Sequence, residues 1–403
     1  MRSLDLLFVV QRYGTEVAGG AEAHCREVAE RLAERGHRVE VATTCARSYV
    51  TWADHYPPGE TEQAGVRVHR FSVDHPRDPS LFEPLCGRVL GDHRPVPYHL
   101  QQAWVEQQGP KCTRLLDHLA QHAGRFDVVV FFTYLYWTTW AGVPVAARTA
   151  PAVIQTTAHD ERPFHLPIFD VSMRAAAGFL CSTPEEAALV EAKVGRHRPI
   201  GMPGVGVDLE ERGAQERFRA LVGLGSRPYL LFLGRVDPHK GTAELVAYFQ
   251  AYKERNRDDL ALVVVGEKVT EVPDHPDIIA AGFVDEATKH DALSGMLALV
   301  VPSYYESFSM VLCEGWANRR PALVQGRCEV LVGQARRSGA AIPYVGFAEF
   351  EVAVQELHRR PDLADALGRA GRRFVETRYS WPNVLSLYED FLWQRKVGGL
   401  SCR

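Results

Sequence analysis

Residues 229–241 read YLLFLGRVDPHKG, an apolar run that leads directly into a loop with two glycines and two long cationic side chains. The apolar run predicts a buried strand over 229–236, and the residues after the loop predict a helix over 242–255. The same order repeats toward the C-terminus, with strands expected at 260–266, 278–284, 297–303 and 321–326 and helices at 286–295, 307–319 and 328–338. Continuous Val, Leu and Ile strands separated by helices are typical of a parallel sheet covered on both faces.

The N-terminal half shows the same pattern from its first residues. An apolar run over 4–10 predicts a strand, a loop ends in Gly19-Gly20, and a helix is expected from Ala21 to about Arg35. Helical spacing assigns the apolar side chains of this helix to the core and its charged side chains to water, and these charged residues are Glu22, Arg26, Glu30 and Glu34. Further strands are expected at 39–44, 128–132, 152–156 and 178–182.

The sequence predicts a helix start after the strand at 178–182 but little structure in the stretch 46–125. After the strand at 178–182, Ser182 or Thr183 is a suitable N-cap and Pro184 a suitable first residue for a helix. The stretch 46–125, rich in His, Pro and aromatic residues, predicts only a helix that ends near Ala123. We interpret that stretch as decoration on two doubly wound domains.

The composition limits the class of protein and its partners. With 403 residues, the chain exceeds the usual size of a single hydrophobic core, so two domains are expected. The net charge of -4 gives no basic excess for binding nucleic acid, and no uncharged stretch is long enough to cross a bilayer. The eight cysteines form no CxxC pair, which favours a reducing compartment. We therefore expect a cytoplasmic monomer or homodimer that binds small or neutral partners.

Ligands of doubly wound sheets bind at the carboxyl ends of the strands, so the loops there are the candidate sites. Arg235 and Lys240 lie on the loop after the strand at 229–236. Arginine supplies a fixed fork of donors and lysine a mobile point charge, a combination suited to the developing charge of a diphosphate leaving group.

Glu306 and Glu314 form the most informative pattern, because seven residues separate them across the start of a helix. Their backbones stand on the order of 12 Å apart, too far to share a metal ion. They must then contact different parts of a long ligand. We interpret Glu306 as a partner of sugar hydroxyls, Glu314 as a partner of ribose hydroxyls, and the amides of Ser309 to Val311 as partners of phosphate, which together fit a nucleotide sugar.

Gly19-Gly20 precedes a helix and would let phosphate approach the positive end of that helix. The spacing does not match GxGxxG, which makes a dinucleotide-dependent dehydrogenase the least favoured reading.

These motifs resemble those of retaining glycosyltransferase family 4, which has the GT-B fold, over essentially the whole chain. The matching residues are Gly19-Gly20-Ala21-Glu22, His159-Asp160, Gly204 to Asp208, Gly234-Arg235, Lys240, Gly282-Phe283, Val301-Pro302-Ser303, and the segment from Glu306 to Glu314. Two positions depart from the family, since Ser307 and Ser309 stand where glycines are usual. The stretch from Gly204 to Gly206 also lacks the usual Asn before Gly-Val-Asp.

The resemblance implies two Rossmann-like domains that face each other across a cleft. Residues 1–205 would bind the acceptor, residues 206–380 would bind the donor, and residues 381–403, with a helix from Val384 to about Lys396, would cross back to the first domain. It further implies donor contacts from Gly19, Gly20, Arg235, Lys240, Gly282, Phe283, Glu306, Ser307, Phe308, Ser309, Met310, Val311 and Glu314.

For the chemistry, the resemblance places His159 beside the donor sugar, with Glu306, Arg235 and Lys240 as the other catalytic residues. Our hypothesis is that His159 positions the sugar while the donor phosphate oxygen accepts the acceptor's proton. Acceptor candidates are Tyr134 and Trp137, from an aromatic run after the strand at 128–132, and Asp160.

The expected function is retaining transfer of a hexose-type sugar to a hydroxyl on a glycan or small molecule, without metal or other cofactor. A UDP-sugar is the favoured donor, with GDP- and dTDP-sugars as alternatives. Two alternatives remain open: a nucleotide-sugar epimerase, and a non-catalytic nucleotide-sugar-binding subunit of the same fold.

Overall fold

The computed structural model describes residues 3–17, 19–91, 95–210, 213–267 and 269–400. The chain divides into two compact units. Unit 1 contains residues 1–203 together with 385–403, and unit 2 contains residues 204–384. The sequence predicted boundaries at 205 and 380, and the last three residues of the predicted segment 381–403 lie outside the described residues.

Unit 1 is built on an eight-stranded sheet in the order β3-β4-β2-β1-β5-β6-β7-β8. Neighbouring strands are parallel except β3, which pairs antiparallel with β4 at the edge. The strands are β1 (Asp5–Val9), β2 (Arg38–Thr44), β3 (Gly59–Gln63), β4 (Val66–Phe71), β5 (Val128–Phe132), β6 (Ala152–Gln155), β7 (Gly178–Leu180) and β8 (Ile200–Gly201).

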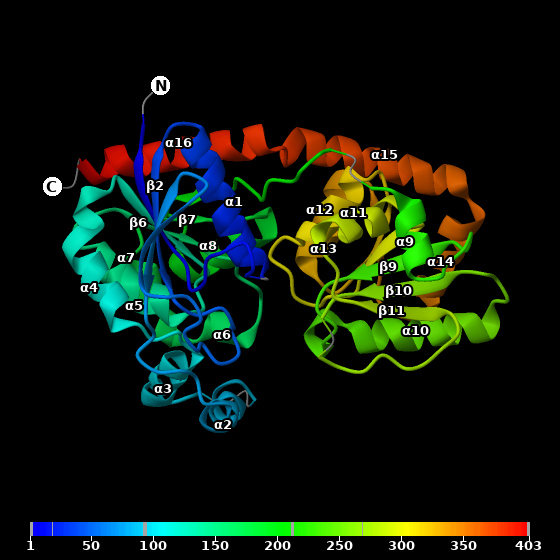
Figure 1. The fold of residues 1–403 in the computed structure, drawn as a ribbon, viewed down its shortest axis with the longest axis horizontal. Coiled ribbons are helices and arrows are strands. Elements are labelled where there is room, and N and C mark those ends of the chain that lie inside the picture. Colours follow the sequence, from blue (N-terminus) through cyan, green and yellow to red (C-terminus); the bar gives the residue numbers. More distant parts are fainter. Residues whose placement is uncertain (1–2, 18, 92–94, 211–212, 268, 401–403) are drawn as a thin grey trace. The chain divides into compact units, whose positions relative to one another are not determined.

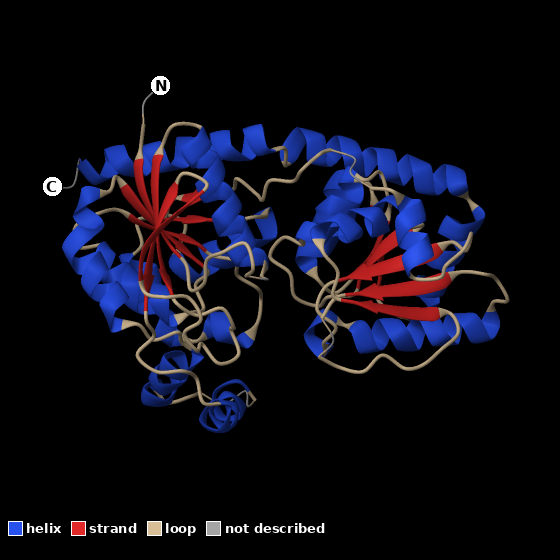
Figure 2. Cartoon of the chain, in the orientation of Figure 1, coloured by secondary structure: helices blue, strands red, loops and turns tan. Residues whose placement is uncertain are grey.

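Helices cover both faces of this sheet, and Figure 2 shows the red strands of the unit enclosed by blue helices. They are α1 (Gly20–Glu34), α2 (Pro79–Leu90), α3 (Tyr98–Gln108), α4 (Thr113–His122), α5 (Trp137–Ala146), α6 (Arg162–His165), α7 (Asp170–Ala175) and α8 (Pro184–Val194), with short turns η1 (Ala123–Arg125) and η2 (Pro167–Phe169). Because side chains alternate along a strand, Phe131 packs in the core with α4 and α5, whereas Phe132 contacts His24 of α1 on the other face.

Unit 2 is built on a six-stranded, all-parallel sheet in the order β11-β10-β9-β12-β13-β14. Its strands are β9 (Tyr229–Leu233), β10 (Ala261–Val265), β11 (Ile278–Gly282), β12 (Ala298–Val301), β13 (Ala322–Gln325) and β14 (Ala341–Tyr344). Its helices are α9 (Gln215–Leu221), α10 (Thr242–Arg255), α11 (Glu286–Gly295), α12 (Met310–Ala317), α13 (Glu329–Ser338), α14 (Phe347–Arg359) and α15 (Pro361–Arg378), with the turn η3 (Pro238–Lys240).

The predicted burial of this sheet on both faces is confirmed. Alternate residues of β9 show it: Leu231 packs with side chains of α11, α12 and α13, and Leu230 packs with side chains of α10 and α14. Both residues are fully buried. Within unit 2, α10 and the group of α11, α12 and α13 lie on opposite sides of the strands (Figure 1).

The structure corrects several sequence-based expectations. The strands of unit 2 are shorter than predicted, and α12 begins at Met310 rather than at 307 because Ser309 has a left-handed backbone (φ 70°). Glu22 was assigned to water but is buried. Besides the helix α4, the stretch 46–125 contains β3, β4, α2 and α3, none of which was predicted from the sequence.

The last helix, α16 (Trp381–Leu400), begins in unit 2 and packs in unit 1 from Leu385 onward, which confirms the predicted return to the first domain. Tyr388 is buried there and its hydroxyl donates a hydrogen bond to Gln155 Oε1 at the end of β6. Gly178 and Gly201 leave room for the ring of Phe391, since a Cβ on either would approach that ring within 2.9 Å. Among the residues described, no helix has the length and apolar character needed to cross a membrane.

We predict that Tyr388→Phe lowers the free energy of unfolding by about 1–3 kcal/mol, because Gln155 Oε1 would stay buried without its donor. The matched control is Leu387→Ala on the same helix, which removes an exposed side chain and should change stability by less than about 0.5 kcal/mol. Urea unfolding measures both. Equal stability of Tyr388→Phe and the wild type would show that this hydrogen bond does not fasten α16.

Candidate functional site

Each sheet has one point at which its strand order reverses. In unit 2 this point lies between β9 and β12, and in unit 1 it lies between β1 and β5. The loops that follow the two strands at such a point run in opposite directions and leave a crevice at the carboxyl edge, where doubly wound sheets bind their ligands. The predicted site residues lie on these loops or on the loops of neighbouring strands.

An ion pair bridges the switch point of unit 2. Lys240 Nζ, on the loop after β9, lies 2.8 Å from Glu306 Oε1, on the loop after β12. The pKa of Lys240 is raised, chiefly because the negative charge of Glu306 stabilises the ammonium group. The structure therefore brings together two residues that are 66 positions apart in the sequence, both of which were predicted to contact the donor.

Asp237 organises the same loop, and the sequence analysis missed it. Its side chain is buried and accepts hydrogen bonds from Arg235 Nε and from the backbone amide of Lys240, the latter at 3.0 Å. Although burial works to raise the pKa of Asp237, these hydrogen bonds outweigh it and lower the pKa. Asp237 thus stays ionised and fixes both cations at the carboxyl edge of β9.

Gly241 lets this loop approach the loop after β12. Its backbone is left-handed (φ 70°), and a Cβ at this position would lie 2.3 Å from the carbonyl oxygen of Pro302. Only glycine fits such a contact without a shift of the backbone. The position of Lys240 relative to Glu306 therefore depends on a glycine one residue away.

The segment from Glu306 to Glu314 divides into side chains that face the core and groups that face the crevice. Phe308 is buried against Tyr379, so its ring belongs to the core rather than to a ligand site. Ser309 is the N-cap residue of α12 but makes no side-chain capping hydrogen bond, and the amides of the first turn, which begins with Met310 and Val311, lack intrahelical acceptors. They remain suited to an anion. Ser307 lies on the same loop, before the helix.

Glu314, inside α12, is paired with a residue that the sequence analysis did not identify. Lys289 Nζ of α11 donates a hydrogen bond to Glu314 Oε1 at 3.0 Å. Burial alone would lower the pKa of Lys289, but Glu314 and Glu286 outweigh burial and raise it. The pair holds the Glu314 carboxylate in one orientation at the edge of unit 2.

Gly282 is the last residue of β11 and Phe283 follows it, at the same carboxyl edge of the sheet. Gly282 is left-handed (φ 73°), and the Phe283 ring is 74% exposed. An aromatic ring this exposed next to a strand's carboxyl end is available for contact with a ligand. The structure thus places the donor residues predicted in unit 2 at strand ends, on the loops that follow strands, or in the first turns of α12, with Phe308 turned inward.

In unit 1, the loop after β1 is held by a buried ion pair. Glu22, in the first turn of α1, accepts hydrogen bonds from Arg12 Nε at 2.8 Å and from Gln11 Nε2 at 2.9 Å. A Cβ on Gly19 would lie 2.2 Å from Glu22 Oε2. Gly19 is therefore needed for this packing, and Gly20 begins the helix at the predicted anion site.

His159 follows β6, and its ring is partly exposed. Its Nδ1 lies 3.3 Å from Glu161 Oε1. Asp160, beside it, is exposed and pairs with His165 Nε2 at 2.7 Å. Asp160 thus pairs with a side chain at the end of the adjacent helix α6.

Tyr134 and Trp137 lie where the acceptor hypothesis does not place them. They are 2% and 4% exposed, and the Tyr134 ring packs edge-on against Phe164 and Phe169. No ring face is left on which an acceptor could stack. Periodicity alone could not separate these core aromatic residues from surface ones, because the aromatic run follows a strand that is itself buried.

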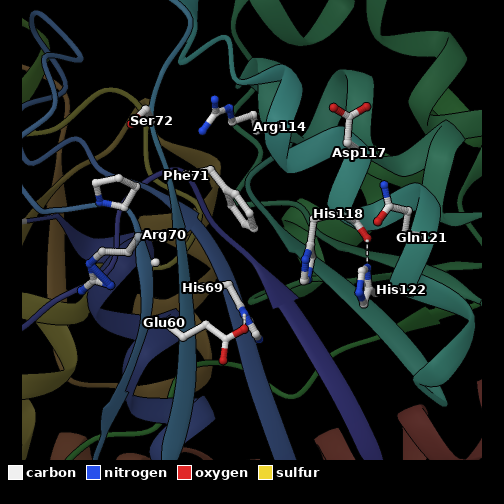
Figure 3. A pocket seen from close by; sticks show the side chains of 12 residues that line it. Glu60, His69, Arg70, Phe71, Ser72, Arg114, Asp117, His118, Gln121 and His122 are labelled. Carbon is white, nitrogen blue, oxygen red and sulfur yellow. Dashed lines mark hydrogen bonds and ion pairs between the residues drawn. The ribbon is translucent and has the colours of Figure 1, made fainter.

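A separate cavity of about 400 Å³ lies in unit 1 between β4 and α4 (Figure 3). Its lining includes His69, His118 and His122, and none of the predicted site residues. The rings of His118 and His122 stack 4.5 Å apart, and burial lowers the pKa of His118 to about 4, so this ring is neutral near pH 7. We interpret the three histidines as packing between strand and helix.

No three His, Cys, Asp or Glu side chains come close enough to hold a metal ion within the described part of the chain. At the carboxyl edge of unit 2, cations instead pair with carboxylates: Lys240 with Glu306, Lys289 with Glu314, and Arg235 with Asp237. Such pairs at the edge of a doubly wound sheet provide both signs of charge for a ligand with phosphate and hydroxyl groups.

Two parallel-sheet domains and a returning C-terminal helix are the features of the GT-B fold of glycosyltransferases. A solved structure with this fold, Anabaena HepE in complex with UDP and glucose, superposes with a TM-score of 0.71. It covers 97% of this chain and 100% of its own, at 13% identity. The fold is therefore GT-B, as the sequence predicted.

Family models identify both domains. Residues 19–202 match the model described as "Glycosyl transferase 4-like domain", and residues 227–359 match "Glycosyl transferases group 1". Together the matches span most of both units. The chain belongs to glycosyltransferase family 4, and it is a glycosyltransferase that uses a nucleotide-sugar donor.

Curated relatives extend over nearly the whole chain. A D-inositol 3-phosphate glycosyltransferase of Arthrobacter sp. (strain FB24) is 25% identical over 94% of this chain and 90% of its own. A GDP-mannose-dependent alpha-(1-6)-phosphatidylinositol monomannoside mannosyltransferase of Mycobacterium tuberculosis is 28% identical over 93% of this chain and 94% of its own.

We predict that Gly241→Ala destabilises unit 2 by about 2–5 kcal/mol and weakens binding of nucleoside diphosphates, because the added Cβ meets the Pro302 carbonyl and displaces Lys240. The control is Gly223→Ala, which also has a left-handed backbone (φ 67°) but has no atom near its Cβ. It should cost only about 1–2 kcal/mol of backbone strain. Calorimetric binding and chemical unfolding test both variants, and equal effects would contradict the steric argument.

Proposed function

We propose that the enzyme transfers a hexose, with retention of anomeric configuration and without a metal ion, from a nucleoside diphosphate to an acceptor hydroxyl. The observation that supports this most directly is the Lys240–Glu306 pair at the switch point of unit 2. A cation there can stabilise a leaving diphosphate, while the carboxylate beside it can accept hydrogen bonds from sugar hydroxyls.

In the proposed complex, unit 2 binds the donor. Arg235, Lys240 and the first amides of α12 contact the diphosphate, and Glu306 contacts the sugar. Glu314, oriented by Lys289, accepts hydrogen bonds from the ribose hydroxyls. The base lies against Gly282 and Phe283. Contacts of this kind fit several bases, so UDP- and GDP-hexoses are both candidate donors.

The proposed reaction balances without an external base. The bond between the anomeric carbon and the β-phosphate oxygen breaks, and the acceptor oxygen forms its bond to the same face of that carbon. The released diphosphate takes the acceptor's proton. His159 positions the hexose, while Arg235 and Lys240 stabilise the charge that develops on the diphosphate.

The proposed acceptor is a hydroxyl of a glycan or of a small molecule. Two relatives support this class, since one is a D-inositol 3-phosphate glycosyltransferase and the other a phosphatidylinositol monomannoside mannosyltransferase. With Tyr134 and Trp137 in the core, we propose that the polar loops after β1 and β6, including Asp160, form the acceptor side in unit 1.

The test is a panel of UDP-, GDP- and dTDP-hexoses with the purified protein, with and without EDTA. We expect one donor to raise the melting temperature and to release its nucleoside diphosphate slowly by hydrolysis, at the same rate in EDTA. The released sugar should keep its anomeric configuration by NMR.

Other outcomes of this panel would point elsewhere. Loss of turnover in EDTA would contradict metal independence, and an inverted anomer would contradict retention. A converted but still nucleotide-bound sugar would indicate an epimerase. Tight binding of a donor without hydrolysis or transfer to any acceptor offered would indicate a binding subunit.

We predict that His159→Ala lowers kcat by about 10²-fold or more and leaves the donor dissociation constant within about twofold of the wild type. The reason is that Arg235, Lys240 and Glu314, which we propose to contact the diphosphate and the ribose, lie in unit 2. The control is His197→Ala, which removes an exposed imidazole from the loop before β8 and should leave turnover unchanged. Turnover of His159→Ala at the wild-type rate would remove His159 from the mechanism.

A further inference from the structure

One buried carboxylate in unit 1 is not explained by the proposed donor or acceptor contacts. Glu186, in the first turn of α8, is only 1% exposed, and no Lys or Arg forms an ion pair with it among the residues described. Burying a carboxylate without a cation is costly, so its hydrogen-bond partners must account for its position.

The local sequence explains how the carboxylate comes to point inward. Thr183 caps α8 and accepts a hydrogen bond from the Glu186 amide at 3.2 Å. In a capping box, the glutamate at this position would bond back to the amide of the cap residue. Here Glu186 Oε2 instead accepts from the amide of Ser182 at 2.6 Å, one residue earlier. The second oxygen is thereby free to reach a neighbouring loop.

That neighbouring loop is the one that carries His159. Glu186 Oε1 accepts a hydrogen bond from the Thr156 hydroxyl at 2.7 Å and another from the Ala158 amide at 2.6 Å. Between these two donors lies Thr157, a β-branched residue with a left-handed backbone (φ 46°). Such a conformation is unfavourable for threonine and persists only where the surroundings fix it.

We propose that Glu186 is a positioning residue, which holds the loop from Thr156 to Ala158 so that His159 is presented at the carboxyl end of β6. This inference rests on the proposed role of His159. The carboxylate joins the strand end of β7, through Ser182, to the loop after β6, so two neighbouring loops are fixed by one group. A misplacement of a catalytic side chain by about 1 Å can lower the rate by about 10²-fold, so a residue that fixes this loop can have a large effect on catalysis.

Electrostatics agree with this geometry. Burial raises the pKa of Glu186, and the hydrogen bonds from Ser182, Thr156 and Ala158, together with the nearby His159, offset only part of that rise. All three hydrogen-bond donors require an acceptor, and an ionised carboxylate offers only acceptors. An amide in its place would turn an N–H group toward at least one of these donors.

The experiment compares Glu186→Gln with the wild type and with Glu191→Gln. Glu191, also on α8, is half-exposed and pairs with Arg196, so the control removes the same charge from the same helix. We expect Glu186→Gln to lower kcat by about 10- to 100-fold while the donor dissociation constant stays within about twofold, and Glu191→Gln to leave both unchanged.

A double-mutant cycle with His159→Ala separates positioning from general damage to the fold. If Glu186 acts through His159, adding Glu186→Gln to His159→Ala lowers kcat by less than about twofold further. The same loss in both backgrounds would overturn the inference. Wild-type kcat in Glu186→Gln would also overturn it.

A further variant and a comparison of outcomes distinguish the positioning role of Glu186 from the proposed role of His159. If Glu186→Gln does not fold, Thr156→Val removes only the hydroxyl donor and should show a smaller loss of kcat that also vanishes in the His159→Ala background. Wild-type turnover of His159→Ala would refute the proposed function of His159 itself. A slow His159→Ala enzyme combined with an additive Glu186→Gln loss would refute only the positioning role.

Discussion

The ion pair between Lys240 and Glu306 joins two loops that leave the sheet of unit 2 on opposite sides of its switch point. The pair depends in turn on two other features of that edge. Gly241 must lack a side chain for the loops to meet, and Asp237 must hold the backbone of Lys240. The pair also keeps a carboxylate and an ammonium group next to each other at the edge of the sheet rather than in the core. A ligand with both anionic and hydroxyl groups can then bind with little rearrangement of the protein.

Three carboxylates act in similar ways in the two units. Glu22 fixes the loop after β1, Glu186 the loop after β6, and Asp237 the loop after β9. In each case a single acid side chain accepts hydrogen bonds from backbone amides or from a neighbouring side chain of a loop at the carboxyl edge. Hydrogen bonds to an ionised acceptor are stronger than neutral ones, which suits loops that have no regular backbone ladder to hold them.

The sequence allowed prediction of the elements whose cause is local. The helices at 242–255 and 286–295 have the predicted bounds, because a left-handed glycine, Gly241, precedes the first and Asp285 caps the second. The loops that carry the candidate site residues could also be predicted, because the strands before them and the helices after them were predicted. The sequence did not predict that Glu314 pairs with Lys289 or that Glu306 pairs with Lys240, because these lysines come close only through folding of the whole sheet. Tyr134 was misread because burial depends on Phe164 and Phe169, which no nearby pattern reveals.

The path of α16 has a consequence for how the protein is made. Unit 1 includes residues at both ends of the chain, and its core contains Tyr388 and Leu392. During synthesis the chain emerges from its N-terminus, so the first two hundred residues leave the ribosome long before their last core side chains exist. Unit 2 is contiguous and can complete its core earlier. The domain that begins first in the sequence is thus the one that finishes folding last.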